Sequence, residues 1–528
     1  MKAQHQTKIF QAMKSPDFYP HPVTSLEERE THISKVFLTG SYVYKIKKAV
    51  NLEFLDFTSL EKRLHFCQQE LVLNRRLAPD VYLDVVPITF SQGRYSLGGN
   101  GPPVEYAVKM RQLPDDRAMK GLLGKSEIDK KVIEELARVL AEFYSQASTG
   151  ERVNAVGTWE TIQANCEENF SLSERFAGKL FDERIFQIVR AASRSFLRRR
   201  KALFQHRIEH GKIRDCHGDL RTDHIYFTDD GIRIIDCIEF NERFRYQDIT
   251  CDLAFLTMGL DYEGFPQFSQ QLLSAYVEHT DDHDVFVLLD FYKCYRAFVR
   301  CKVNCFRIEQ GGLDEQERND LIRETEKYLD FASRYALQFT RPTLWIVCGM
   351  PASGKSTVSE ELAKAFEIKV FHSDIVRKEL FSATPDDSGV VPFGEGIYSV
   401  LATSFTYGKL LLLAQEEIDR GNSVILDATY SSERWRTEAS RLAKDHDVNI
   451  IFAECVASDD LLKERLRKRE TTSSVSDARI HHFEQFRKRY EPLKELQDEI
   501  HIQVDTEKPL GECMKQILSS YKTGNWKY

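Results

Sequence analysis

The chain has 528 residues, of which 42% are hydrophobic and 29% charged, and its formal net charge is -8 at pH 7. This length predicts two or three domains of ordinary globular composition, and the net negative charge argues against a general nucleic-acid binder. No apolar run is long enough to predict a membrane span, and the polar first stretch lacks the apolar core of a signal peptide. The 11 cysteines follow no framework spacing, which predicts reduced thiols in the cytoplasm.

The first part of the chain, residues 1–339, begins with alternating strand and helix patterns and then becomes mostly helical. The predicted strands are Val36–Leu38, Tyr42–Ile46 and Val104–Met110, and the predicted helices include Leu60–Leu77 and Ser126–Tyr144. We place a domain boundary near Thr340, because Pro342 limits helical continuation. Beyond it, strand and helix patterns alternate as expected of a parallel sheet covered by helices.

Two aspartates in the first domain have the spacing of a kinase site. Asp219 lies in a His-Gly-Asp run, and Asp236 follows 17 residues later, across a predicted hairpin that turns near Asp230. One such carboxylate can accept the proton of an acceptor hydroxyl, while the other holds Mg²⁺ against the phosphates of ATP. We therefore predict Asp219 as the general base and Asp236 as a metal ligand.

These motifs resemble those of the aminoglycoside phosphotransferase family, a branch of the protein-kinase-like fold. The resemblance covers about Val36 to Ala336 and implies a bilobal domain whose small lobe ends near residue 112. It places His224 where the family has a metal-binding Asn, although imidazole is a poorer ligand for Mg²⁺ than oxygen donors are. Cys237 replaces the Phe of the second motif, and Asp252 matches a stretch that supports the catalytic loop.

The same resemblance implies a lysine and a glutamate that bind and orient the phosphates of ATP. Lys45 is the expected lysine, and Lys47, on the same face of its strand, is the alternative. Glu70 in the following helix is the expected ion-pair partner, with Glu61 as the alternative. The segment Val104–Leu113 would form the hinge between the lobes and offer backbone contacts to adenine.

A phosphate-binding loop opens the second domain, residues 340–528. The run from Gly349 to Thr357 fits G-x-x-x-x-G-K-[ST] and lies between a strand-like run and an amphipathic helix pattern. Such a loop wraps a phosphate with its backbone N–H groups at a helix N-terminus. Lys355 would reach the β- and γ-phosphates, and the Ser356 hydroxyl would bind Mg²⁺. The predicted nucleotide-binding residues are Gly349, Pro351, Ala352, Ser353, Gly354, Lys355, Ser356 and Thr357.

Three further features of this domain fit phosphoryl transfer. Asp374 ends a short strand and is a candidate base, with a helix N-cap as the alternative. Asp427 ends a buried strand and matches a Walker B metal ligand, with an ordinary strand-end turn as the alternative. A basic helix that carries Arg465 and Arg469 precedes the polar stretch Thr471–Asp477. It is interpreted either as a lid that closes arginines over the transferred phosphate or as a solvated helix face.

The second domain resembles the small P-loop kinases of the gluconate kinase, polynucleotide kinase and zeta-toxin type. The resemblance covers roughly Thr343 to Tyr521. It implies roles for Lys355 and Ser356 toward nucleotide and metal, and it leaves the substrate open. The order of the two domains is similar to that of bacterial proteins that combine a phosphotransferase-like domain with an ATP-binding P-loop domain.

The fold class expected is therefore α/β and α+β in two domains, a bilobal kinase-like domain followed by a P-loop domain with a parallel sheet. The function expected is a bifunctional ATP-dependent phosphotransferase that uses Mg²⁺, with a hydroxyl of a small-molecule or nucleotide-like acceptor in each site. One alternative is that the first domain is an ATP-binding regulator, which His224 favours, and that only the P-loop domain is catalytic. A further alternative is an ATPase switch.

Overall fold

The structure is a computed structural model, and it describes residues 3–52, 55–366, 368–381, 396–470, 479–496 and 500–523. The chain divides into two compact units. The first consists of Met1–Asp182, Lys201–Asp281 and Tyr295–Phe331, and the second of Glu183–Arg200, Asp282–Cys294 and Ala332–Tyr528. The second unit thus includes two segments that precede the predicted boundary near Thr340. Among the described residues, no helix is both long and apolar enough to cross a membrane.

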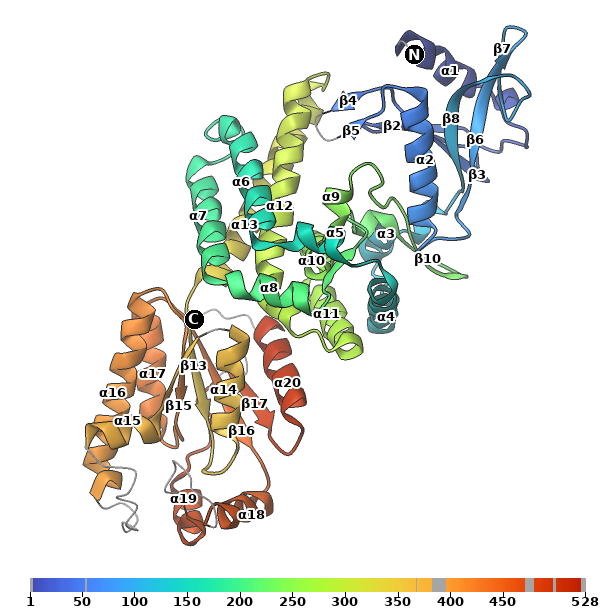
Figure 1. Ribbon diagram of the computed structural model, residues 1–528. Helices are drawn as coiled ribbons and strands as arrows, with labels where there is room; N and C mark the ends of the chain where they lie inside the picture. Colours follow the sequence, from blue (N-terminus) through green and yellow to red (C-terminus); the bar gives the residue numbers. More distant parts are fainter. Residues whose placement is uncertain are drawn as a thin grey trace. The chain divides into compact units, whose positions relative to one another are not determined.

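The N-terminal part of the first unit is built on a six-stranded antiparallel sheet in the order β1-β2-β3-β8-β6-β7 (Figure 1). Its strands are β1 (Glu27–Glu30), β2 (Ser34–Leu38), β3 (Tyr42–Lys47), β6 (Tyr82–Ser91), β7 (Arg94–Leu97) and β8 (Pro103–Arg111). Residues of α1 (Ala3–Met13) pack with Tyr44 and Ile46 of β3. Since successive side chains of a strand point to opposite faces, Lys45 and Lys47 face α2 (Leu60–Asn74) instead.

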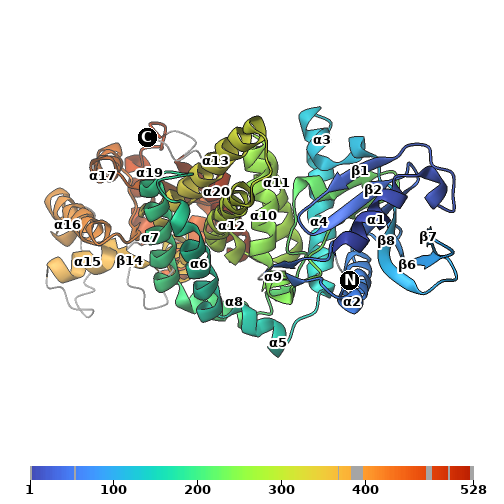
Figure 2. The same cartoon turned by 90° about the horizontal axis from the view of Figure 1, so that it is seen from above.

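The larger part of the first unit is mainly helical. Its helices are α3 (Met119–Gly124), α4 (Lys130–Gln146), α5 (Glu151–Asn154), α6 (Trp159–Ser173), α8 (Lys201–Glu209), α9 (Glu242–Arg245), α10 (Ile249–Tyr262) and α11 (Pro266–Thr280), with parts of α12 (Asp284–Gln310) and α13 (Glu315–Thr340). The largely buried α10 lies beside α11 (Figure 2).

Two short antiparallel ribbons position the kinase-like motifs of this unit. They are β9 (Ile213–Asp215) with β12 (Tyr246–Asp248), and β10 (Ile225–Thr228) with β11 (Gly231–Ile234). The ribbons bring the two motif-bearing loops together, because the Ile235 amide donates to His224 O at 3.0 Å and the Ile238 amide donates to His217 O at 3.1 Å.

The second unit contains a five-stranded parallel sheet in the order β14-β15-β13-β16-β17. Its strands are β13 (Thr343–Cys348), β14 (Lys369–His372), β15 (Val424–Asp427), β16 (Asn449–Val456) and β17 (His501–Asp505). Its helices are α7 (Glu183–Arg199), α14 (Lys355–Phe366), α15 (Ser373–Leu380), α16 (Val400–Asp419), α17 (Glu433–Asp445), α18 (Asp459–Glu470), α19 (Phe483–Arg489) and α20 (Leu510–Thr523), with the remaining parts of α12 and α13.

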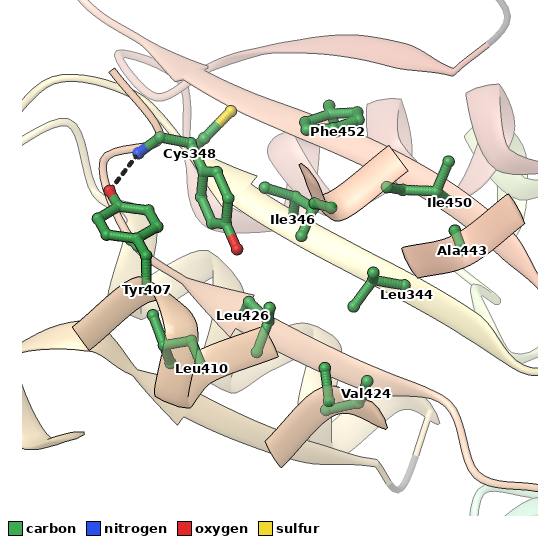
Figure 3. Packing of buried hydrophobic residues seen from close by; sticks show 14 of the residues in the cluster. Leu344, Ile346, Cys348, Tyr407, Leu410, Val424, Leu426, Ala443, Ile450 and Phe452 are labelled. Atoms are coloured by element: carbon green, nitrogen blue, oxygen red, sulfur yellow. Dashed lines mark hydrogen bonds between the residues drawn. The ribbon is translucent and has the colours of Figure 1, made fainter. Parts of the chain in front are cut away.

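The central strand β13 is buried along its whole length, as its uninterrupted apolar sequence predicts for a parallel sheet. On one face, Leu344 and Ile346 pack with Leu410 of α16 and Ala443 of α17 (Figure 3). The Tyr407 hydroxyl in the same cluster accepts from the Tyr430 amide at 3.0 Å. The predicted fold class, a kinase-like first part followed by a parallel sheet flanked by helices, is confirmed.

Candidate active sites

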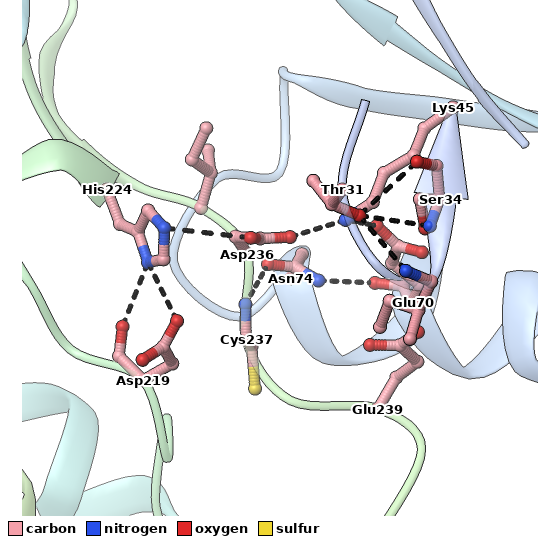
Figure 4. Close-up of polar contacts among 12 residues, drawn as sticks. Thr31, Ser34, Lys45, Glu70, Asn74, Asp219, His224, Asp236, Cys237 and Glu239 are labelled. Atoms are coloured by element: carbon pink, nitrogen blue, oxygen red, sulfur yellow. Dashed lines mark hydrogen bonds and ion pairs between the residues drawn. The ribbon is translucent and has the colours of Figure 1, made fainter. Parts of the chain in front are cut away.

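Two lysines of β3 face the buried Glu70 of α2. Lys45 Nζ lies 2.9 Å from Glu70 Oε1 and also donates to Asp236, while Lys47 Nζ lies 2.7 Å from Glu70 Oε2 and also donates to Glu239 (Figure 4). Burial opposes the charge of Glu70, yet Lys45 and Lys47 hold its pKa below the ordinary value. The side chain of Lys47 is fully buried, whereas the side chain of Lys45 is 14% exposed. Of these two lysines, only Lys45 is accessible to a ligand.

The structure places the alternative glutamate and the expected hinge elsewhere. Glu61 lies exposed in the first turn of α2. Most of Val104–Leu113 is strand β8, which pairs with β3 on one side and β6 on the other. The chain therefore leaves the sheet only after Arg111, and a hinge is limited to the residues that follow.

The loop that carries Asp219 is held by the buried carboxylate of Asp252. Its two oxygens accept from the backbone amides of His217 and Gly218, each at 2.9 Å. The Tyr144 hydroxyl donates to the same carboxylate at 3.0 Å. Gly218 has φ of +87°, and a Cβ there would lie 2.9 Å from a backbone oxygen, so this position requires glycine.

His217 supports the same loop as a neutral ring. Its Nδ1 accepts from the Asp219 amide at 3.3 Å, and its Nε2 donates to Ile235 O at 3.0 Å. Burial lowers the pKa of His217 to about 4. The neutral imidazole thus ties the loop of Asp219 to the chain segment just before Asp236.

Three side chains of the two loops converge on one point (Figure 4). One ligand atom from each of Asp219, His224 and Asp236 lies within 4.8 Å of the others. Asp236 has φ of +66°, a conformation that is uncommon outside glycine and costly unless its surroundings hold it. Burial opposes its charge, but the neighbouring Lys45 holds the pKa of Asp236 below the ordinary value. The predicted base and both predicted metal ligands of the first domain are therefore neighbours.

The loop between β13 and α14 has the backbone of a phosphate cradle. Gly349 has φ of +131°, and a Cβ there would lie 2.4 Å from a carbonyl oxygen of β16; Gly354 has φ of +90°. The Ser353 hydroxyl is buried with no hydrogen-bond partner among the described residues. Lys355 Nζ donates to Met350 O at 2.9 Å, back across the loop. Glycines with positive φ, an unpartnered buried hydroxyl and a lysine beside the loop fit a site that wraps phosphate.

Asp427, at the end of β15, lies next to this loop. Its Oδ2 accepts from the Ser356 hydroxyl at 2.7 Å, and His372 Nδ1 lies 2.7 Å from the same oxygen. The hydrogen bond to Asp427 raises the pKa of His372. Asp374 lies inside the first turn of α15, and the N-cap position belongs to His372, whose side chain makes no capping bond. Ser356, Asp427 and Asp374 therefore lie at one edge of the sheet, where strand ends bind ligands.

Arg465 of α18 contacts the backbone of the phosphate loop. Its Nη2 donates to Thr506 O at 2.7 Å, and its Nη1 donates to Ala352 O at 3.3 Å. The side chain of Arg469 and the stretch Thr471–Asp477 lie outside the described residues. Within the described part, the basic helix is attached to the loop through Arg465.

Sequence reasoning missed two residues that contact the predicted sites. Glu239 binds the buried Lys47, and an acidic residue between Ile238 and Phe240 was the available signal. His372 binds Asp427, and the parallel register pairs these two strand-end residues directly. No feature of the sequence alone could indicate that register.

Two family models match parts of this chain. Residues 115–286 match a family model described as a phosphotransferase enzyme family, and residues 344–493 match one described as an AAA domain. Uncharacterized protein Rv2004c of Mycobacterium tuberculosis and uncharacterized protein Mb2027c of Mycobacterium bovis are each 31% identical over 468 residues, covering 87% of this chain and 90% of the relative.

Two solved structures are also similar to parts of this chain. A putative kinase from Chloroflexus aurantiacus is 23% identical and has a TM-score of 0.28, covering 34% of this chain and 97% of that chain. A choline/ethanolamine kinase family protein from Mesorhizobium loti is 12% identical and has a TM-score of 0.38, covering 64% of this chain and 100% of that chain.

Proposed function

Because this chain belongs to the same family as these mycobacterial proteins, and a phosphotransferase-family domain precedes a P-loop domain in it, we propose that it is a bifunctional ATP-dependent phosphotransferase. Each site transfers the γ-phosphoryl group of ATP to a hydroxyl of a small-molecule or nucleotide-like acceptor. The observation that carries the proposal is that each unit has its own lysine and its own buried or partly buried aspartate beside a candidate phosphate position. The domain boundary we propose remains near Thr340.

In the first site, the side chains divide the work of a kinase. Lys45, oriented by Glu70, binds the phosphates of ATP. Asp219 accepts the proton of the acceptor hydroxyl. Asp236 and His224 are the residues that would hold a divalent ion, which when bound neutralises phosphate charge.

In the second site, the loop from Gly349 binds phosphate through backbone N–H groups, and Lys355 leaves Met350 O to bind the β- and γ-phosphates. Ser356 and Asp427 already share a hydrogen bond and would hold Mg²⁺ through their oxygens. Asp374 serves as the base for the acceptor hydroxyl. Arg465 keeps the loop in place from the side of α18.

A second candidate is that the first domain binds ATP but regulates rather than catalyses. The observation that favours it is His224, which replaces the oxygen ligand of the family's metal site with an imidazole. In that case the P-loop domain is the only enzyme of the chain.

The deciding experiment supplies γ-labelled ATP and a metabolite extract to the full chain and to two variants. We expect Asp219→Asn to abolish one labelled product and Lys355→Ala to abolish a different one. The matched controls are Asp229→Asn and Lys364→Ala, whose side chains are 91% and 74% exposed, and both should keep both products. If Lys355→Ala removes all labelled product and Asp219→Asn removes none, the bifunctional proposal fails and the regulatory reading stands.

A further inference from the structure

One ring nitrogen of His224 faces the carboxylates of the first site. Its Nδ1 lies 2.9 Å from the backbone carbonyl oxygen of Asp219. Because a carbonyl oxygen only accepts hydrogen bonds, Nδ1 carries the proton, and in the neutral ring Nε2 then has a free electron pair. Histidines that bind metals are oriented in this way, with the other ring N–H donated to a carbonyl or carboxylate.

The distance across the site suits a bound cation. His224 Nε2 lies 3.6 Å from Asp236 Oδ2, too far for a hydrogen bond, so two electron-pair donors face each other. At metal–ligand distances of about 2.1 Å, two ligands of one ion lie about 3.0–3.5 Å apart. Asp219 belongs to the same cluster, since one ligand atom from each of the three side chains lies within 4.8 Å of the others, and its Oδ2 lies 3.6 Å from His224 Nδ1.

The two oxygens of Asp236 have different roles. Oδ1 accepts from Lys45, which leaves Oδ2 on the side of His224. Arg221 Nη2 donates to His224 Nε2 in a long hydrogen bond of 3.4 Å, and the Nε of the same guanidinium donates to Asp223 at 3.0 Å. Asp223 Oδ2 itself lies 3.9 Å from Nε2. Two carboxylates and one guanidinium therefore surround this nitrogen, and a bound cation would replace the hydrogen bond from Arg221.

An imidazole and carboxylates select a different ion from the one that oxygen ligands select. Mg²⁺ prefers oxygen ligands, whereas imidazole suits first-row transition ions and Mn²⁺ also accepts carboxylates. We propose that the first site binds a divalent transition ion such as Mn²⁺ in preference to Mg²⁺, through His224 Nε2 and Asp236. The P-loop site, where Ser356 and Asp427 offer only oxygens, keeps the ordinary preference for Mg²⁺. The inference rests on the proposed function only for the role of the ion in turnover, because binding can be measured by itself.

The test titrates Mn²⁺ alone into the full chain carrying Asp427→Ala, which removes a proposed metal ligand of the second site. Binding is followed by electron paramagnetic resonance, and pulsed measurements detect nitrogen coupled to the ion. We expect nitrogen coupling, and we expect His224→Asn in the same background to abolish it and to weaken Mn²⁺ binding at least about tenfold without weakening Mg²⁺ binding. His279→Asn, an exposed histidine of the first unit, is the matched control and should change neither.

Two results would contradict the proposed metal site. Bound Mn²⁺ without nitrogen coupling, or equal affinities for Mn²⁺ and Mg²⁺ that His224→Asn does not alter, would overturn the inference and make His224 a hydrogen-bonding group. His224→Gln, with its fold checked by circular dichroism, repeats the test if the Asn variant unfolds. Label transfer from ATP is measured in parallel. Nitrogen-coupled Mn²⁺ without transfer would reject the kinase role of the first domain but keep the metal site, whereas transfer with Mg²⁺ and no coupling would do the reverse.

Discussion

Replacing Lys47 with methionine tests how the buried charges beneath the first site are balanced. Lys47 is fully buried and pairs with both Glu70 and Glu239. Methionine fills much of the same volume but leaves Glu239, whose pKa burial already raises, without its cation. Removing one partner of a buried pair costs about 3–5 kcal/mol. Because Lys45 still pairs with Glu70, we expect Lys47→Met to lie toward the lower end of that range.

A second substitution separates lost pairing from lost packing. In Lys47→Met with Glu239→Gln, no carboxylate is left without a cation, so we expect about 2 kcal/mol of the loss to be recovered as a coupling between the two positions. Lys48→Met is the matched control, since Lys48 is partly exposed and pairs with the exposed Glu30, and its loss should cost less than about 1 kcal/mol.

Hydrogen exchange of the full chain, followed by mass spectrometry, measures the effect within the sheet itself. For Lys47→Met we expect the protected amides of β3 and β8 to exchange about a hundredfold faster or more, since each 1.4 kcal/mol is a factor of about ten. Exchange within about fivefold of the unaltered chain, or no recovery on adding Glu239→Gln, would refute the buried-pair reasoning. That result would also return Lys47 to consideration as the lysine that binds ATP.

Three further outcomes are expected. Because burial lowers the pKa of His217 from 6.5 to about 4, its neutral form stabilises the fold fully above pH 6.5, and up to about 3 kcal/mol is lost as the pH falls toward 4. His217→Gln should therefore make the melting temperature depend less on pH over that range. An unchanged slope of melting temperature against pH would contradict a neutral ring. Gly349→Ala should lower the melting temperature and abolish ATP binding by the loop, because its Cβ would meet a carbonyl oxygen of β16 at 2.4 Å. Gly421→Ala, with φ of +78° but open space, should cost only about 1–3 kcal/mol of backbone strain and keep binding, so equal effects would refute the steric argument. Arg465→Ala should weaken binding of a fluorescent ATP analogue about tenfold, because its contacts with the phosphate loop are lost. Substitution of the exposed Arg467 with alanine should leave this binding unchanged. Equal affinities of the two variants would favour the interpretation of α18 as a solvated helix face.

Much of the fold and many of the candidate residues could be predicted because their signals are local. The apolar run of β13, the loop from Gly349 to Thr357 and the following helix are adjacent in sequence, and phosphate binding requires those residue types in that order. The matches to a phosphotransferase family and to an AAA domain confirm the predicted two-domain resemblance. The role of Asp252 also follows from a motif, and its bonds to the amides of His217 and Gly218 show how it supports the loop.

Contacts between distant segments could not be predicted in this way. Lys45 and Lys47 lie on the same face of one strand, so the sequence pattern alone allows either lysine to bind ATP. The two lysines differ in the residues that cover them. Glu239 lies 192 residues from Lys47 along the chain and pairs with it, whereas Lys45 lies beside Asp236. His372 likewise reaches Asp427 only through the pairing of β14 with β15.

By itself, then, the sequence determined that this protein has two phosphotransferase-type domains, because each motif places chemically necessary groups within a short stretch of chain. Only the tertiary structure decided which lysine stays accessible, that Arg465 contacts the phosphate loop, and that His224 Nε2 faces Asp236. The physical reason is that burial and electrostatic partners arise from the packing of segments that are far apart in sequence, and a local pattern carries no information about that packing.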